Sequence, residues 1–361
     1  MQVVYLDNNA TTKPDPQVVA AMVPFLQELY GNPSSAHRFG QRSRQAIDEA
    51  RAQLADFLGC SDRELIFTGG GTEASNTAFR SLLAARAPRT VVVTSTVEHS
   101  ATKQMCEKHV DAGLDVRSVG VHDDGTLDMD ALASALDDDV AFCTMMWANN
   151  ETGVLFDVAQ IADICREKGV PFHCDATQAL GKIPADFHRL GFDMATIASH
   201  KFHGPKGVGA LFVRKGLRVD PLLVGGPQER ARRGGTENVP GIVGLGKAAE
   251  VAKDKLPDMA RVEKVLFNQT WYQIRVPEGV TSYVSKAFVN AQGDGETGTI
   301  NQDRTPVKAA SLRGPGESYR EQLLLSKDDT VTILAEEGNY YKVVSPKDAF
   351  VFIPAGTLRK A

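Results

Sequence analysis

Cysteine is absent from the second half of the chain. No cysteine lies between Asp175 and Ala361, and the part before it holds only five. An odd number of cysteines without paired spacing disfavours a disulfide framework and is typical of a reducing compartment. We therefore expect free thiols at all five positions, which are Cys60, Cys106, Cys143, Cys165 and Cys174.

An excess of basic residues is also absent. Lysine and arginine together number 40, against 45 aspartates and glutamates, which gives a formal net charge of -5. Nucleic acids and anionic membranes usually require a basic surface, so neither is expected as a partner. No apolar run approaches the roughly 20 residues that span a bilayer. The first residues, MQVVYLDNNATT, lack the basic start and apolar stretch of a secretory signal, and we expect a cytoplasmic protein.

The residues that are present predict an α/β fold. The chain has 361 residues, of which 42% are apolar and 24% charged, as in a soluble globular protein of two to three domains. Up to about residue 252, short β-branched segments alternate with segments of helical periodicity. Alternation of this kind predicts a mostly parallel sheet. The expected strands are Leu65–Thr68, Val91–Thr94, Ala141–Met145, Val170–His173 and Ala210–Val213, and the expected helices include Gln41–Leu58, Ser100–Ala112 and Asp157–Lys168.

The chain after about residue 256 has a different pattern, with strand-like segments separated by turns that contain glycine and proline. It repeats itself at an offset of 69 residues, so that Asn268–Pro277 aligns with Glu337–Pro346. The repeat indicates two copies of one small β unit, and the alternative is a coincidence between two generic hairpins. With Asn290–Gln302 as a glycine-rich linker, the expected domains are residues 1–254, 255–292 and 293–361.

Three segments that follow predicted strands are candidates for chemistry. Gly69–Asn76 brings a glycine run to the start of a helix, which suits a phosphate but also makes a plain turn. Asp175 ends a strand, either as a ligand carboxylate or as a helix N-cap. Ser199–Gly207 contains Lys201, either a Schiff-base lysine or a solvated one. Ligands of such folds bind at the carboxyl ends of the strands, so the three segments are expected to meet.

A single ligand accounts for the three segments together. Pyridoxal phosphate offers a phosphate, a pyridine nitrogen and an aldehyde. The helix N-terminus would hold the phosphate, Asp175 would keep the ring nitrogen protonated, and Lys201 would bind the aldehyde. His99, after the strand Val91–Thr94, would stack on the ring, and its alternative is an ordinary surface or core histidine. No metal site is expected.

In its motifs the chain resembles the cysteine desulfurases, the class V branch of the aminotransferase-type pyridoxal-phosphate enzymes. The resemblance runs from Tyr5 to about Ala252, about two thirds of the chain, and the motifs occur in family order. It implies an aminotransferase-like large domain with a mostly parallel sheet, and the tail resembles paired bacterial SH3-like β-barrels. The matching motifs are Tyr5–Thr12, Tyr30–Ser35, Gly70–Ala74, Val97–His99, Ala148–Gly153, Asp175–Gln178, His200–Gly207 and Gly225–Asn238.

The resemblance also implies roles for individual residues. Lys201 matches the Schiff-base lysine, Asp175 the partner of the ring nitrogen, and His99 the stacking and acid–base histidine. Asn150 and Gln178 match contacts to the ring hydroxyl. The family's phosphate contacts match Gly71, Thr72 and His200, together with Thr236 from a second subunit, which implies a homodimer.

The chain departs from the family pattern at two places. The family usually has Ser-x-His-Lys, whereas here Ser199 directly precedes His200, and whether Ser199 takes over the phosphate contact is open. Family members also carry a nucleophilic cysteine far downstream of the lysine, and no cysteine follows Lys201 here. Cys174 adjoins Asp175, but its position inside a predicted strand favours a small buried residue over a replacement nucleophile.

The family reaction converts L-cysteine to L-alanine and passes the sulfur to an enzyme thiolate, for iron–sulfur cluster or thio-cofactor assembly through a sulfur-acceptor protein. The chain has the residues for the cofactor but lacks that thiolate. Three expectations follow. The first is a cysteine desulfurase-like protein acting on L-cysteine or a related amino acid. The second is a catalytically inactive scaffold that binds the cofactor and carries a peptide- or cell-wall-binding tail, and the third is a fused or truncated gene product.

Overall fold

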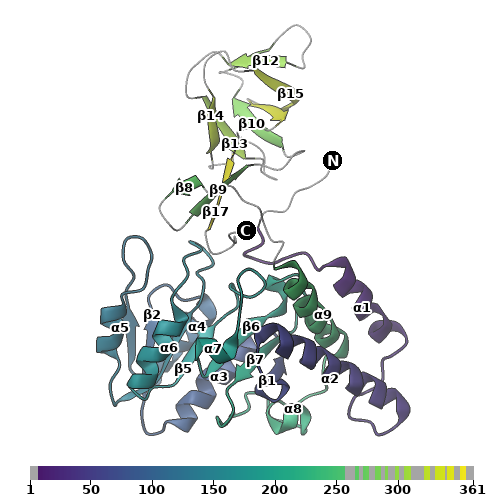
Figure 1. Cartoon of the computed structure of the whole chain (residues 1–361), viewed down its shortest axis with the longest axis vertical. Coiled ribbons are helices and arrows are strands. Elements are labelled where there is room, and N and C mark those ends of the chain that lie inside the picture. Colours follow the sequence, from purple (N-terminus) through teal and green to yellow (C-terminus); the bar gives the residue numbers. More distant parts are fainter. Residues whose placement is uncertain are drawn as a thin grey trace. The chain divides into compact units, whose positions relative to one another are not determined.

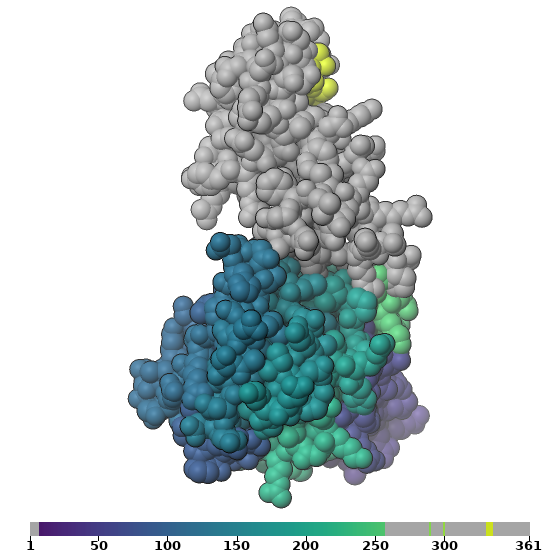
Figure 2. All heavy atoms as spheres, turned by 60° about the vertical axis from the view of Figure 1, so that its left-hand side comes forward, coloured from purple at the N-terminus to yellow at the C-terminus, as the bar shows by residue number. Residues whose placement is uncertain are grey.

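The computed structural model describes residues 7–256 in full and, in the tail, the backbone of ten strands. Contacts between residues divide the chain into a large unit, which contains residues 7–256, and a smaller unit, which contains most of the tail strands. In the space-filling view, segments from the whole length of the large unit, coloured purple to green, lie against one another in one closely packed body (Figure 2). Each unit is described by itself below.

The large unit is built on a seven-stranded sheet in the order β1-β7-β6-β5-β4-β2-β3 (Figure 1). Only β7 runs against its two neighbours, β1 and β6, while the remaining neighbouring pairs are parallel. The predicted α/β fold with a mostly parallel sheet is therefore confirmed. The strands are β1 (Leu65–Thr68), β2 (Val91–Ser95), β3 (Val116–Val119), β4 (Val140–Met146), β5 (Phe172–Asp175), β6 (Met194–Ala198) and β7 (Gly209–Val213).

Helices cover both faces of this sheet. On one face, α3 and α4 pack against a cluster that contains Phe79 and Phe142. On the other face, α2, α5, α6, α7 and α9 contribute to a larger cluster around Phe192 and Phe212. The helices are α1 (Pro16–Gln27), α2 (Arg38–Leu58), α3 (Gly71–Ala85), α4 (Ser100–Asp111), α5 (Met129–Ala135), α6 (Val158–Glu167), α7 (Phe187–Leu190), α8 (Gln228–Ala231) and α9 (Val239–Lys255), with 3-10 turns η1 (Asp62–Glu64) and η2 (Ser199–Lys201).

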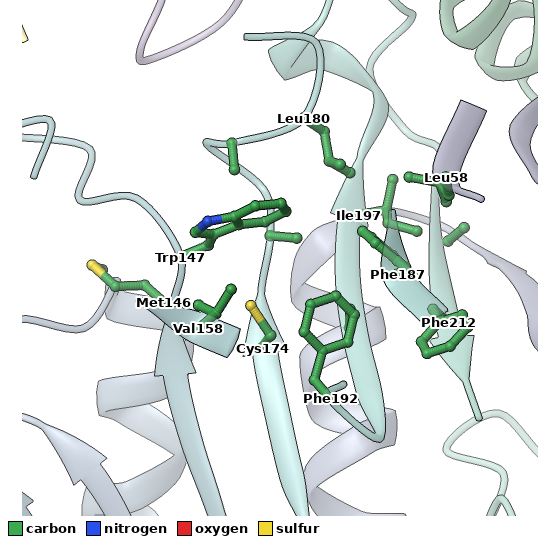
Figure 3. Close-up of a cluster of buried hydrophobic side chains, with 14 of the residues drawn as sticks. Leu58, Met146, Trp147, Val158, Cys174, Leu180, Phe187, Phe192, Ile197 and Phe212 are labelled. Atoms are coloured by element: carbon green, nitrogen blue, oxygen red, sulfur yellow. The ribbon is translucent and has the colours of Figure 1, made fainter. Parts of the chain in front are cut away.

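Strand β5 begins two residues later than the sequence predicts, and ends on Asp175. Pro171 has no N–H to donate to a neighbouring strand, and Val170 donates its N–H to Cys165 O at 2.8 Å instead. Alternation along the strand then places Cys174 on the face opposite Asp175. Figure 3 shows its sulfur among the apolar side chains between Trp147 and Phe192, where it is fully buried.

The tail is described only by its strands. Seven of them form an antiparallel sheet in the order β11-β12-β15-β16-β10-β13-β14, and β17, β9 and β8 form a second sheet. Strand β16, in the predicted domain 293–361, pairs with β10, in the predicted domain 255–292. This pairing joins the two predicted domains in one sheet. The SH3-like barrels stay a prediction. The strands are β8 (Val265–Phe267), β9 (Trp271–Arg275), β10 (Thr281–Ser285), β11 (Val289–Ala291), β12 (Thr297–Ile300), β13 (Thr305–Ala309), β14 (Glu321–Leu325), β15 (Thr330–Glu337), β16 (Tyr340–Val344) and β17 (Phe350–Pro354).

Two further features, membrane-spanning helices and metal sites, were searched for among the described residues. Among them, no helix combines the length and the apolar character needed to cross a membrane. The same residues contain no group of three or more histidine, cysteine, aspartate or glutamate side chains placed to hold a metal ion. The predicted linker at residues 290–302 contains the end of β11 and all of β12, which pair with each other, and its other residues lie outside the described part.

Candidate active site

A cavity of about 260 Å³ opens at the carboxyl ends of β4, β5 and β6. The position is the one that a parallel α/β sheet favours for ligands, because the loops after the strands converge there. The three segments singled out from the sequence meet in this cavity. Of the predicted site residues, it is lined by Gly71, Thr72, His99, Asn150, Asp175, Gln178, His200 and Lys201.

A second hollow of about 470 Å³ shares Gly71, Thr72 and His200 with the cavity. Helix α3 begins here, so its first backbone N–H groups have no partner within the helix and can bind an anion. A Cβ atom on Gly71 would lie 3.3 Å from Ala198 Cβ and 3.4 Å from Thr196 Cγ2, so a glycine lets the helix start close to β6. The hollow is therefore suited to a phosphate group.

The amine of Lys201 is half-buried on η2, directly after β6. Its Nζ donates hydrogen bonds to Asn9 O at 2.5 Å and to Ala10 O at 3.0 Å. Burial lowers the pKa of Lys201, and the negative charges of Asp175 and Asp7 act in the opposite direction. A lowered pKa increases the fraction of free amine, which is the nucleophilic form.

Asp175 presents a buried carboxylate to the same cavity. Its Oδ1 accepts a hydrogen bond from Thr177 N at 3.0 Å, as an N-cap would, but residues 176–183 form turns and not a helix. The second carboxylate oxygen is left for a ligand. The carboxylate thus has the position of a ligand contact with only part of a capping role.

A buried histidine lies behind Asp175 and was missed by the sequence interpretation. His173 Nδ1 lies 2.8 Å from Thr144 Oγ1, and its Nε2 lies 2.9 Å from Thr196 Oγ1. Thr196 Oγ1 is in turn 2.9 Å from Ser75 Oγ, at the cavity wall. Burial lowers the pKa of His173 to about 4, so the ring is neutral at pH 7. The signal was its place two residues before Asp175, on the same face of the strand.

His99 lines the cavity from the N-terminus of α4. Its Nδ1 accepts a hydrogen bond from Ala101 N at 3.2 Å, so in the neutral ring the hydrogen is on Nε2. The carboxyl of the preceding residue, Glu98, is buried and accepts hydrogen bonds from Ser95 Oγ at 2.5 Å and Met146 N at 3.0 Å. Burial raises the pKa of Glu98 to about 8, which keeps this acid largely uncharged at neutral pH.

Two predicted site residues do not line the cavity. Ser199 is fully buried, and a Cβ atom on Gly204 would come within 2.0 Å of its Oγ, so the hydroxyl is packed against the backbone of the following loop. Thr236 also lies outside the cavity lining. The phosphate contacts of Ser199 and of Thr236, the latter across a subunit boundary, stay predictions.

The five thiols are away from this chemistry, since none of them lines either hollow. They are free, as expected, and four of them are buried. Burial raises the pKa of Cys60 to about 12 and of Cys106 to about 11, and also raises the pKa of Cys143 and Cys174. Thiols with raised pKa values are poor nucleophiles, because the thiolate is the reactive form.

Fold and site together define a class of protein. An amine, a buried carboxylate, an imidazole and a helix N-terminus converge at the carboxyl edge of a mostly parallel sheet. This set matches an aldehyde, a pyridine nitrogen, an aromatic ring and a phosphate, so the residues present fit pyridoxal phosphate. The class is that of α/β proteins that hold this cofactor through a lysine.

The chain belongs to the aminotransferase class-V family, which it matches over residues 4–292. This match extends beyond Ala252, where the motif resemblance ends. The chain is similar to cysteine desulfurase 2 of Trichormus variabilis, with 46% identity over 290 residues that cover 80% of this chain and 71% of the relative. It is also similar to a cysteine desulfurase of Bradyrhizobium diazoefficiens, with 50% identity over 261 residues, 72% of this chain and 66% of the relative. Class-V aminotransferases and cysteine desulfurases depend on pyridoxal phosphate.

Solved structures show the same relationship. A NifS-like protein superposes with a TM-score of 0.70 and 38% identity over 71% of each chain. The protein SspA, solved in complex with cysteine, superposes with a TM-score of 0.68 and 29% identity over 76% of this chain and 84% of its own. The predicted cysteine desulfurase resemblance is thereby confirmed at the level of the family.

Proposed function

We propose that this chain is a pyridoxal-phosphate-dependent protein of the cysteine desulfurase type, with L-cysteine as its substrate. The observation that carries the proposal is the meeting of the Lys201 amine with Asp175 and the N-terminus of α3 in one cavity. Lys201 is buried enough to have a lowered pKa, which prepares it to bind an aldehyde. The similarity to cysteine desulfurases and to SspA, solved with cysteine, supports L-cysteine over other amino acids.

The residues divide the work of holding the cofactor. The backbone at Gly71 and Thr72 and the ring of His200 line the hollow that would hold the phosphate. Asp175 places a carboxylate where a ring nitrogen can donate to it, and Asn150 and Gln178 line the wall near Lys201. The bound cofactor supplies an electron sink, which makes the α-hydrogen of an amino acid acidic.

Proton movement falls to two side chains. Lys201 Nζ, with its lowered pKa, can take up a proton at the substrate α-carbon. His99 has its Nδ1 occupied by Ala101 N, so its Nε2 is the atom free to exchange a proton at the cavity mouth. Both residues line the same cavity.

The sulfur acceptor in this proposal is a thiol other than the five cysteines, on a separate molecule such as a sulfur-acceptor protein. The C–S bond of cysteine breaks and an S–S bond forms on the acceptor. The acceptor thiol loses one proton as its S–S bond forms, and the β-carbon gains one proton as the C–S bond breaks, so cysteine plus thiol gives alanine plus persulfide. The burial and raised pKa values of the chain's own thiols support an external acceptor. In the cell such sulfur would serve iron–sulfur cluster or thio-cofactor assembly.

The test follows the cofactor and the product separately. The purified chain loaded with pyridoxal phosphate should absorb as a lysine-bound cofactor and should form alanine from L-cysteine when a small thiol is added. Lys201→Ala should lose the absorbance band and reduce alanine formation at least about 10²-fold. Lys168→Ala, an exposed lysine at the C-cap of α6, is the matched control and should change neither. A colourless wild-type protein, or a band that survives Lys201→Ala, would contradict the proposal.

The burial of four of the five thiols also favours a second candidate, a scaffold that binds the cofactor without turnover and whose tail binds a peptide or cell-wall ligand. The same experiment separates the two functions. The scaffold shows the absorbance band but forms no alanine at any thiol concentration, whereas the desulfurase forms alanine at a rate that rises with the thiol.

A further inference from the structure

A second lysine is buried behind the cavity wall. Lys182 is only 8% exposed and does not line the cavity, whereas Gln178, one helical-type turn before it, does. Lysine is seldom found in a protein interior, because removing the ammonium from water is unfavourable. Within residues 7–256, no carboxylate acts on the charge of Lys182, and the charge that does act on it is that of Lys201. Its retention inside the fold therefore calls for a role.

The backbone holds Lys182 close to the reactive lysine. Gly181 has a φ of +72°, which disfavours any residue with a Cβ atom, and a Cβ there would lie 2.5 Å from Phe202 Cβ. Phe202 directly follows Lys201 in the chain. The turn that carries Lys182 is thus packed against the segment that carries Lys201.

The contacts of Gln178 determine the positions of its amide oxygen and amide nitrogen. Lys182 Nζ lies 2.6 Å from one end, and since an ammonium only donates, that end is the oxygen Oε1. The other end lies 2.9 Å from the carbonyl oxygen of Asn9, and since a carbonyl only accepts, that end is Nε2. If the amide were flipped, its N–H group would face the Lys182 ammonium and its oxygen would face the carbonyl oxygen of Asn9.

The nitrogen end of this amide is also the end nearer to Lys201. Asn9 O accepts both the hydrogen bond of Gln178 Nε2 and that of Lys201 Nζ, at 2.5 Å. The N–H group of Gln178 and the reactive amine therefore share one acceptor. A group bound at Lys201 meets a hydrogen-bond donor on this side.

We propose that Lys182 is a positioning residue that holds the Gln178 amide with its N–H toward Lys201. The inference rests on the proposed function, because the Gln178 N–H would donate a hydrogen bond to the ring hydroxyl oxygen next to the aldehyde of the cofactor. A donor favours that oxygen in its ionised form, whereas an amide oxygen in the same place would repel it. Lys182 acts through Gln178 and touches neither cofactor nor substrate.

The electrostatics agree with this role. Burial and the positive charge of Lys201 lower the pKa of Lys182 to about 8. Burial also lowers the pKa of Lys201, against the pull of Asp175 and Asp7. An amide turned the wrong way would offer Lys201 an acceptor and so raise the pKa of its amine.

The first measurement is a pH titration of the absorbance band of bound pyridoxal phosphate. Lys182→Met keeps the length of the side chain and removes its donor and charge, and we expect the apparent pKa of the band to rise by about 1 unit. In a Gln178→Leu background the same substitution should move it by less than half as much, because there is no amide left to orient. Lys168→Met, at an exposed site, is the control and should leave the titration unchanged.

The second measurement needs no cofactor. The pKa of the Lys201 amine in the cofactor-free chain is obtained from the pH dependence of its reductive methylation, followed by mass spectrometry. Lys182→Met should raise this pKa, and again less so in the Gln178→Leu background. If the wild type fails to bind the cofactor, the proposed function is wrong and this measurement still tests the inference.

Two results would overturn the positioning role. One is a Lys182→Met protein that titrates within about 0.2 unit of the wild type in both measurements. The other is an equal shift in the presence and absence of Gln178, which would assign the effect to charge alone. Circular dichroism verifies that each variant is folded, and Lys182→Leu, which also lacks a donor and a charge, replaces Lys182→Met in both proteins that carry it if the methionine variant does not fold.

Discussion

Three ionisable side chains around the cavity are shifted toward their uncharged forms. Burial raises the pKa of Glu98 to about 8, and lowers that of His173 to about 4 and that of Lys182 to about 8. The carboxylate of Asp175 contributes to the raised pKa of Glu98. Because Glu98 and His173 are largely uncharged at neutral pH, fewer charges compete with the interaction between Asp175, Lys201 and the group that binds between them.

At the residue scale, the buried acid gives a pH-dependent stability. The pKa of Glu98 is about 8 in the fold against 4.5 for the ordinary value, so folding takes up a proton between these pH values. The wild type should therefore lose stability as the pH rises from about 4.5 to 8. Glu98→Gln keeps an acceptor for Ser95 Oγ and Met146 N and should be more stable than the wild type at pH 9 by at least about 1 kcal/mol.

Urea unfolding at pH 5 and pH 9 tests this expectation. The gain of Glu98→Gln should be confined to the higher pH, and the exposed Glu107→Gln on α4 should show no such difference. An equal effect of Glu98→Gln at both pH values would mean that the carboxyl is not held in its neutral form.

At the element scale, α8 shows how a strained segment is anchored. Glu229, Arg230 and Ala231 have φ values of 47°, 60° and 61°, a left-handed run that residues other than glycine seldom adopt. The buried carboxylate of Glu229 accepts from Arg51 Nη2 at 2.6 Å, from Arg51 Nη1 at 2.9 Å and from Phe67 N at 3.0 Å. These bonds tie the segment to α2 and β1 and so hold in place the loop that carries Thr236.

Breaking this pair should destabilise the large unit strongly. Glu229→Gln leaves the buried guanidinium of Arg51 without a countercharge and should lower the free energy of unfolding by about 3–5 kcal/mol. Arg51→Met should have a similar effect, and the double variant should lose less than the sum of the two. Urea unfolding of the four proteins completes this cycle. Additive losses would show that the two side chains do not depend on each other.

At the scale of the whole molecule, the predicted homodimer would complete the phosphate site. Thr236 does not line the cavity of its own chain, so its predicted phosphate contact requires a second copy. Thr236→Val should therefore weaken cofactor binding by about 10-fold or more, the loss expected for a hydrogen bond to a charged group. Titration with pyridoxal phosphate measures this loss.

Mixed subunits test whether the contact crosses between chains. Lys201→Ala supplies an intact Thr236 but no reactive amine, and Thr236→Val supplies the reverse. Refolded together, the two should regain a tightly bound cofactor in up to half of the sites of the mixed dimers. No recovery in a mixture that sedimentation shows to be dimeric would place Thr236 within its own subunit.

Much of the site could be predicted from sequence, because residues close in the chain stay close in the fold. Strand ends followed by glycine, aspartate or lysine identified Gly71, Asp175 and Lys201, and the parallel sheet brings such ends to one edge. The direction of the Ser199 side chain could not be predicted in this way. Its neighbours line the cavity, but the backbone of the 3-10 turn directs its hydroxyl into the packed interior at Gly204.

The residues that sequence reasoning missed are joined by contacts distant along the chain. The acceptors of the Lys201 amine are carbonyl groups of Asn9 and Ala10, which lie 192 and 191 positions away. No side-chain pattern reveals a backbone acceptor. No motif in the sequence marks Lys182, and its burial became visible only where the turn at Gly181 packs against Phe202.

The sequence by itself determined the α/β fold of the large unit, the family and the cavity-lining groups, since periodicity and local motifs are properties of neighbouring residues. It also established that no cysteine follows Cys174. Only the tertiary structure decided that Cys174 faces the apolar core, that Ser199 is turned away from the cavity, and which ionisable groups lose their charge. Those outcomes depend on burial, and burial is fixed by which distant segments pack together.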